Sequence, residues 1–145
     1  MKKLIILAVA IASAISVFGQ QIEINVKKLE YYSYHEDFPE LLNIKENWND
    51  VHSKYVFDCK KKTMTTEFQN YPEQNAVTPV LVQKSKNGIY TFRFNDTDIA
   101  TSKMLMKTAI TVDTNKKEVL YTIYMPEYQV FKNFKFTDFD LIVSK

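Results

Sequence analysis

The chain of 145 residues has few of the residues that cross-link, break or loosen a fold: one cysteine, two glycines and four prolines. A single cysteine excludes an internal disulfide, so the fold must be held together by its core. Two glycines exclude a glycine-rich phosphate-binding loop and the Gly-x-Ser-x-Gly motif of serine hydrolases. With 46% hydrophobic and 14% aromatic residues, the composition also excludes a collagen-like or disordered chain.

Residues 1–19 have the layout of a secretory signal peptide. Lys2 and Lys3 precede an apolar run from Leu4 to Phe18, and Val17-Phe18-Gly19 provides a cleavage site. Because the run is shorter than the ~20 residues of a membrane-spanning helix, we expect a cleaved leader rather than an anchor. The segment resembles a bacterial Sec signal. We therefore predict a periplasmic or secreted protein with a single β-rich domain over residues 20–145 and no membrane span after cleavage.

Cleavage would remove the excess of positive charge. The whole chain has 19 Lys and Arg against 17 Asp and Glu, and two of the lysines lie in the leader. The mature chain is then neutral, with no global electrostatic attraction to nucleic acid or anionic lipid. Nucleic acid is therefore not expected as a partner.

Hydrophobic alternation with a period of two predicts about eight strands. The expected strands cover residues 22–34, 55–60, 63–68, 80–84, 89–95, 104–112, 119–125 and 130–143, the last as two strands or one bent strand. Asn87-Gly88 predicts a hairpin with a type I′ turn. Asp58 and Asp113 each begin a lysine-rich turn, where an aspartate can accept backbone N–H groups. Residues 69–79 and 95–102 are expected to be loops, and a helix over 102–107 is the alternative to the start of a strand.

One segment has helical rather than strand periodicity. Leu41, Ile44, Trp48 and Val51 follow one another at helical spacing, after an Asp and a Pro suited to a helix start. We expect an amphipathic helix from Pro39 to His52. The predicted fold class is mainly β (α+β): a single antiparallel, strongly curved or barrel-like sheet with this helix near the mature N-terminus. A flatter sheet lying on the helix is the alternative.

The residues with the most chemical potential do not form a recognisable motif. His35, His52 and Cys59 are metal ligands by type, but their spacing matches no standard zinc or copper pattern. We expect surface or capping histidines and a buried, inert thiol. We therefore predict no catalytic residue, no metal ligand and no cofactor. A small metallo- or thiol-dependent hydrolase that uses these three residues is the least favoured alternative.

The many aromatic and methionine side chains are the remaining clue to function. Those expected on inward faces, and offered as candidate lining residues of an apolar cavity, are Tyr90, Phe92, Phe94, Met104, Met106, Tyr121 and Ile123. The competing interpretation is that these side chains simply fill the core.

We expect an exported, non-catalytic binding domain for an apolar or amphipathic small ligand or a partner protein. The alternative is an envelope-associated assembly component that pairs an exposed strand edge, for which Phe139–Val143 is the candidate. The oligomeric state is left open.

Overall fold

The computed structural model describes residues 20–97 and 104–145, so the predicted signal peptide lies outside the described residues. The described chain is all-β and contains no α-helix, only a short 3-10 helix, η1 (Pro72–Gln74). In chain order the strands are β1 (Gln21–His35), β2 (Phe38–Trp48), β3 (Ser53–Asp58), β4 (Thr63–Phe68), β5 (Ala76–Pro79), β6 (Leu81–Lys84), β7 (Ile89–Thr97), β8 (Met104–Asp113), β9 (Glu118–Met125) and β10 (Val130–Ser144).

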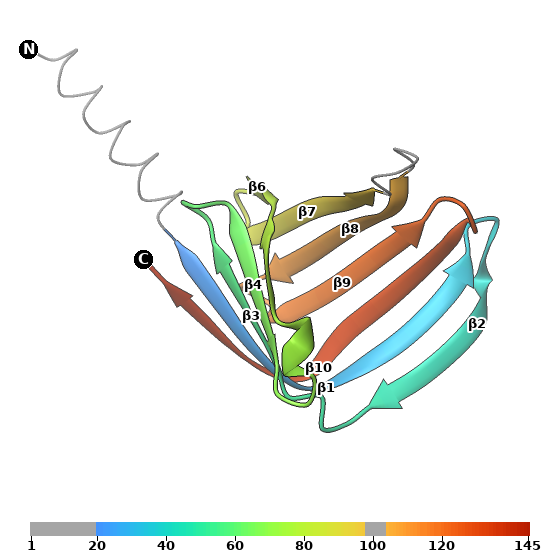
Figure 1. Ribbon diagram of the computed structural model, residues 1–145, viewed down its shortest axis with the longest axis horizontal. Helices are drawn as coiled ribbons and strands as arrows, with labels where there is room; N and C mark the ends of the chain where they lie inside the picture. Colours follow the sequence, from blue (N-terminus) through green and yellow to red (C-terminus); the bar gives the residue numbers. More distant parts are fainter. Residues whose placement is uncertain (1–19, 98–103) are drawn as a thin grey trace, which may run out of the picture.

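All ten strands belong to one antiparallel sheet that curls into a nearly closed barrel (Figure 1). The strand order is β5-β4-β3-β1-β10-β9-β8-β7-β6, with β2 paired to β1 outside this path. The two ends of the sheet, β5 and β6, are separated in sequence only by Val80. Its backbone N–H donates to the Lys62 carbonyl at 2.9 Å, and its side chain is buried. The prediction of a strongly curved antiparallel sheet is confirmed, with ten strands instead of about eight.

The curvature of the sheet is concentrated in its two longest strands, β1 and β10. The first half of β1, Gln21–Val26, pairs with β3, and the second half, Leu29–His35, pairs with β2. Register shifts on either side of Lys28 mark a β-bulge between the two halves, where bulges typically bend a strand. The sequence predicted either two strands or one bent strand over residues 130–143. The structure has one bent strand, β10, which includes them.

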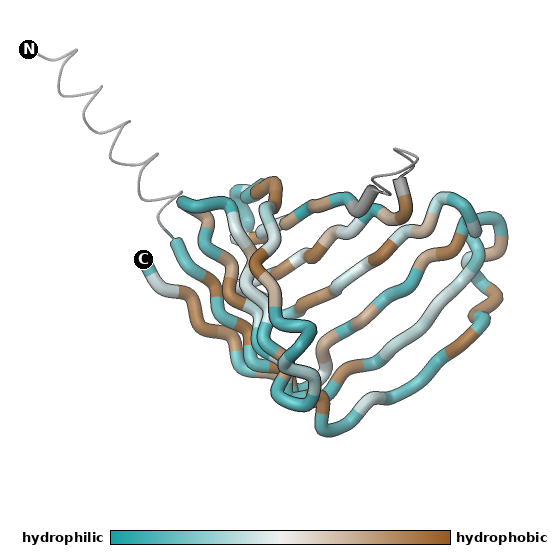
Figure 2. Tube along the Cα trace, viewed as in Figure 1, coloured by the Kyte–Doolittle hydropathy of each residue, from teal (hydrophilic) through white to brown (hydrophobic). Residues whose placement is uncertain are grey.

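The core lies at the end of the barrel where the opposite walls of the sheet meet. Phe57 on β3 stacks on Phe92 on β7 with 4.0 Å between ring centroids, although four strands separate β3 from β7 in the sheet. Hydrophobic and hydrophilic residues alternate along the strands (Figure 2), as expected when one face of each strand points into a core. The fully buried side chains around this contact include Ile22, Ile24, Val26, Ile110, Val112 and Val119.

The predicted helix over Pro39–His52 is wrong: the segment forms the edge strand β2 and its continuation toward β3. On one side of β1, β3 pairs only with the first half of the strand. Without β2, the second half of β1 would have no hydrogen-bonding partner on that side. Pairing of these backbone groups therefore outweighs a helical periodicity, since buried or sheet-facing N–H and C=O groups must be satisfied. Left-handed backbone at Asp50 (φ 56) and His52 (φ 46) ends the segment.

The predicted turns are partly correct. The hairpin around Gly88 is present, but Gly88 (φ 77) is the only residue of its turn with positive φ, so the turn is not type I′. The expected role of the aspartates is confirmed: Asp58 Oδ1 accepts the N–H groups of Lys60 and Lys61 at 3.0 and 2.9 Å. Asp113 Oδ1 accepts two N–H groups in the same way.

Two further expectations about local structure need correction. Residues 69–79 are not entirely loop, since they contain η1 and the edge strand β5, which pairs with β4. Residues 104–107 belong to β8 and are not helical, while 98–103 lie outside the described residues. Each segment pairs with the preceding strand across a connection, β5 with β4 and β8 with β7, and local periodicity does not reveal such pairing.

Candidate ligand cavity

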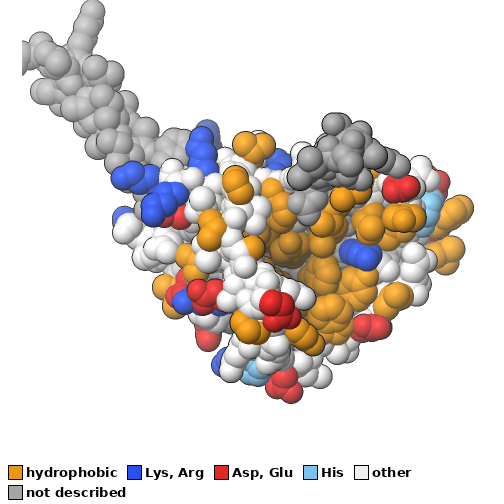
Figure 3. All heavy atoms as spheres, viewed as in Figure 1, with side chains coloured by type: hydrophobic (Ala, Val, Ile, Leu, Met, Phe, Trp, Pro, Cys, Tyr) orange, Lys and Arg blue, Asp and Glu red, His pale blue; other side chains and the backbone are white. Residues whose placement is uncertain are grey.

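The open end of the barrel contains a large apolar cavity. Its volume is about 940 Å³, and its wall is formed by the inner faces of strands from both sides of the curled sheet together with the segment around η1. Figure 3 shows hydrophobic side chains gathered on this hollowed face. The lining residues are Leu29, Trp48, Asn49, Asp50, Val51, Tyr55, Met64, Thr66, Phe68, Asn70, Tyr71, Gln74, Thr78, Phe94, Tyr121, Ile123 and Phe134.

Aromatic rings determine where the cavity begins. Next to the closed core, Tyr55 on β3 contacts Tyr121 on β9 edge-on, with 6.1 Å between centroids. Phe134 packs against Tyr121 at 5.7 Å and against Tyr31 at 5.0 Å. Across the barrel, the stacked pair nearer the core, Phe57 and Phe92, has 4.0 Å between centroids, whereas Tyr55 and Tyr121 have 6.1 Å. Tyr55, Tyr121 and Phe134 all line the cavity and form its floor.

The cavity brings together some of the seven candidate lining residues and leaves others in the core. Phe94, Tyr121 and Ile123 line it. Tyr90 and Phe92 are 2% and 0% exposed and pack in the closed core, so they do not line the cavity. Met106 is half-buried on β8, and the side chain of Met104 lies outside the described residues.

Most of the lining residues were not among the candidates from the sequence. Tyr55, Phe68 and Thr78 come from β3, β4 and β5, and Trp48 comes from the segment expected to be a helix. Alternation places Tyr55 and Phe57 on one face of a strand, which is the only local signal available. Which end of that face is closed and which is open depends on the curvature of the whole sheet.

One row of residues across the inner wall contains three polar side chains next to residues that line the cavity. The ladder registers place Ser33, Lys132, Ile123, Thr108 and Phe94 directly opposite one another on five strands, β1, β10, β9, β8 and β7. Directly opposed residues share a face of the sheet, and Ile123 and Phe94 line the cavity. Lys132 therefore lies on the inner face of the sheet.

Two groups in this row have no polar partner. Among the described residues, Lys132 forms no ion pair, since the four ion pairs found there involve other residues. Thr108 is 3% exposed, and its Oγ1 has no hydrogen-bond partner. A buried hydroxyl without a partner costs on the order of 1–3 kcal/mol. The inner wall thus presents one half-buried cation and one unsatisfied hydroxyl beside an apolar cavity.

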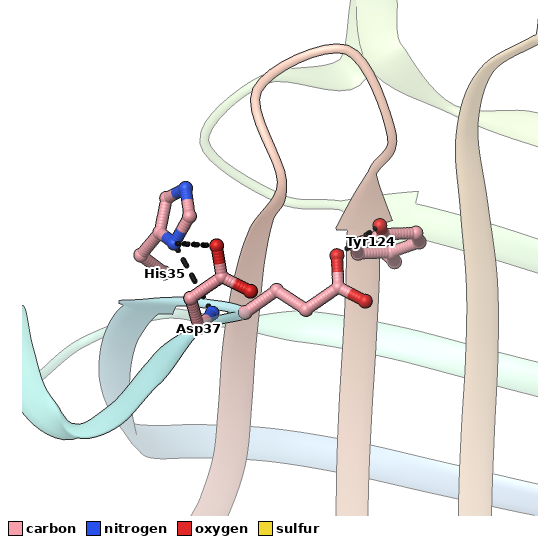
Figure 4. Close-up of polar contacts among 4 residues, drawn as sticks. His35, Asp37 and Tyr124 are labelled. Carbon is pink, nitrogen blue, oxygen red and sulfur yellow. Dashed lines mark hydrogen bonds and ion pairs between the residues drawn. The ribbon is translucent and has the colours of Figure 1, made fainter.

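The histidines and the cysteine lie apart from one another in the structure. His35 Nδ1 accepts the N–H of Asp37 at 3.1 Å in the β1–β2 turn, while Tyr124 Oη donates to Glu36 at 2.6 Å (Figure 4). That hydrogen bond raises the pKa of Tyr124. His52 lies 3.9 Å from Asp50, near the start of β3. Within residues 20–97 and 104–145, no group of three or more His, Cys, Asp or Glu could hold a metal ion.

Cys59 follows β3 and is buried, as expected from the sequence. Burial raises the pKa of its thiol, the charge of Asp58 raises it further, and Lys84 partly opposes both. A raised pKa keeps the sulfur in its protonated, weakly nucleophilic form near neutral pH.

Comparison with protein families, with curated proteins and with solved structures finds no match for this chain. In the part of the chain that the structure describes, no helix is long and apolar enough to cross a membrane.

Proposed function

We propose that the protein binds an apolar or amphipathic small molecule in the cavity at the open end of its barrel. The observation that carries this proposal is the aromatic-lined cavity of about 940 Å³. Ligand sites are typically concave, largely apolar and about 300–1,000 Å³ in volume, with a few polar groups in the wall. An unfilled apolar surface of this size in water is unfavourable, and a ligand that covers it gains the corresponding hydrophobic free energy.

The proposal also covers the biological setting expected from the sequence. Export by the predicted signal peptide would place the binding domain in the periplasm or outside the cell. The role is binding without catalysis, with no cofactor. Support comes from the arrangement of the site, whose wall is mostly hydrocarbon and aromatic surface.

A matched pair of variants on β5 tests the cavity. Thr78 lines the cavity, whereas its neighbour Val77 is 67% exposed on the opposite face of the strand. We expect Thr78→Trp to fill part of the cavity and to weaken binding of the neutral fluorophore N-phenyl-1-naphthylamine at least tenfold. Val77→Trp adds the same bulk outside and should leave the affinity within about twofold. Each affinity is measured by fluorescence titration of the folded protein.

Two results would overturn the proposal. The first is absence of fluorophore binding to the wild-type protein. The second is equal weakening by both tryptophan variants, because an outward tryptophan cannot reach the cavity.

A second candidate function, assembly through a strand edge, is favoured by the exposed apolar side chains of β2. Leu41 is 62% exposed and Phe38 is 53% exposed, and β2 pairs only with β1 among the described strands. Open strand edges are templates for pairing with another chain. The edge predicted from the sequence, Phe139–Val143 of β10, pairs with β1 on one side. On its other side, the ladder with β9 covers only Val130–Lys135 and does not reach it.

Light scattering after size-exclusion chromatography tests this second candidate. Assembly through β2 predicts a mass above that of the monomer that falls to the monomer mass in Leu41→Lys. Wild-type protein that remains a monomer at high concentration and gains no partner from an envelope extract would remove it.

A further inference from the structure

We infer that the ligand of the cavity is an anionic amphiphile, with an apolar body on the aromatic floor and an acidic head group on Lys132. This inference rests on the proposed function and specifies the chemistry of the ligand. Its basis is Lys132, a half-buried cation that forms no ion pair among the described residues and lies on the inner face next to residues that line the cavity.

The position of Lys132 relative to the cavity follows from two neighbours. Its register partner on β9 is Ile123, and Phe134 lies two residues further along β10 on the same face. Both of these side chains line the cavity. Lys132 itself is not a lining residue, so its place in the row puts it at the edge of the cavity, on the side away from the closed core.

The charges around Lys132 leave it available for a ligand. In the row on the core side of Lys132, the acidic residue is Glu46 on β2, which accepts the Nε1–H of Trp48 at 2.9 Å. Asp50 at the cavity rim lies 3.9 Å from His52. Neither carboxylate forms an ion pair with Lys132 among the described residues. A half-buried cation gains more from an ion pair with a desolvated acid than an exposed lysine does.

The head group would pair with Lys132 alone. The hydroxyl of Thr108, two strands away on β8, is enclosed by protein, and Thr108 does not line the cavity. An anionic head would pair with the lysine, while a neutral ligand would leave it unpaired.

Two fluorophores that share one apolar body test the inference. N-phenyl-1-naphthylamine is neutral, and 1-anilinonaphthalene-8-sulfonate is the same body with a sulfonate. We expect Lys132→Met to weaken binding of the sulfonate about tenfold, the effect of losing one charged hydrogen bond. The neutral fluorophore should bind within about twofold of wild type. Lys132→Arg should retain the preference for the anion.

The matched control is Lys135→Met, because Lys135 is exposed on the opposite face of the same strand. It removes the same charge without touching the inner wall, and it should leave both affinities unchanged. Thr108→Val should leave both affinities unchanged while raising the free energy of unfolding of the unliganded protein, since it removes an unsatisfied buried hydroxyl that does not line the cavity.

The outcomes separate this inference from the proposed function. Equal binding of both fluorophores, unchanged by Lys132→Met, would overturn the anionic ligand and leave an apolar cavity in place. Equal loss of sulfonate binding in Lys132→Met and Lys135→Met would also overturn it, because the effect would then be one of net charge. Binding of neither fluorophore to wild type would overturn the proposed function itself.

Discussion

Single residues in this protein are arranged to satisfy polar groups locally, with few exceptions. The carboxylates of Asp58 and Asp113 each cap a turn by accepting two backbone N–H groups. Lys54 forms a 2.7 Å ion pair with Glu23 across β3 and β1. The unsatisfied hydroxyl of Thr108 is an exception to this pattern: it is buried on the inner face of β8, between Ile123 and Phe94 in the sheet. Buried polar groups without partners are uncommon in native proteins.

The buried thiol of Cys59 predicts a particular dependence of stability on pH. Because its pKa is raised in the folded state, folding favours the protonated thiol. The stability that Cys59 contributes is fully present below the unfolded pKa of about 8.5 and is lost as the pH rises above it toward the folded value. We expect the difference in free energy of unfolding between wild type and Cys59→Ala to decrease steadily over this range.

Urea denaturation at a series of pH values measures this difference, and the Cys59→Ala variant controls for the titration of all other groups. Alkylation by iodoacetamide at pH 8 should also be slow in the folded protein and fast in urea. A difference that grows with pH, or rapid alkylation of the folded protein, would contradict the buried thiol.

At the scale of elements, the strands contribute unequally to the fold. The first half of β1 lies between β3 and β10, with its inward side chains completely buried. By contrast, every residue of β2 is exposed, and the strand is held by its ladder with β1. Its register shifts near Ile44 and its proline at position 39 are features that natural edge strands use against unwanted pairing.

This difference predicts the effect of substitutions in β2 and in the core. Leu41→Ala on β2 should change the free energy of unfolding by less than about 0.5 kcal/mol, as for other exposed sites. Phe57→Ala, at the stacked contact between β3 and β7, should lower it by about 3–5 kcal/mol through the cavity it creates. Urea unfolding measures both. A large cost for Leu41→Ala would instead mean that β2 is covered in solution, as the second candidate function requires.

The whole molecule is a curled sheet that is packed at one end and open at the other. The closed end contains the stacked Phe57 and Phe92, and the open end contains a cavity with aromatic walls. Because the two ends differ in this way, the packed end can provide stability while the open end of the same sheet provides a binding surface. The proposed ligand would complete the packing that the strands leave unfinished.

Binding in the cavity should therefore stabilise the whole fold. If N-phenyl-1-naphthylamine binds only the folded state, a free concentration of 100 times its Kd should raise the free energy of unfolding by about 2.7 kcal/mol. Thermal or urea unfolding with and without the fluorophore measures this shift. Thr78→Trp should show little of it at the same concentration, and Val77→Trp should show all of it. A shift of equal size in both variants would point to binding outside the cavity.

Much of the fold could be read from local sequence, because strand periodicity and turn chemistry act over a few residues. The alternation of Ile22, Ile24 and Val26 predicted a half-buried strand, and that strand is β1. The aspartates of the two lysine-rich turns accept the backbone N–H groups that their position predicted. Burial of Cys59 was predicted from its place in an apolar strand, and the thiol is buried although β3 ends one residue earlier, at Asp58.

The conformation of β2 and the position of the cavity were decided only by the tertiary structure. Trp48 and Ile44 have a spacing compatible with both a helix and one face of a strand, and the unpaired half of β1 selects the strand. Tyr90 and Phe94 lie on one face of β7, yet the first is in the core and the second lines the cavity. The reason is physical: alternation defines which face of a strand points inward, whereas the bend of β1 and β10 defines how far apart the inward faces lie.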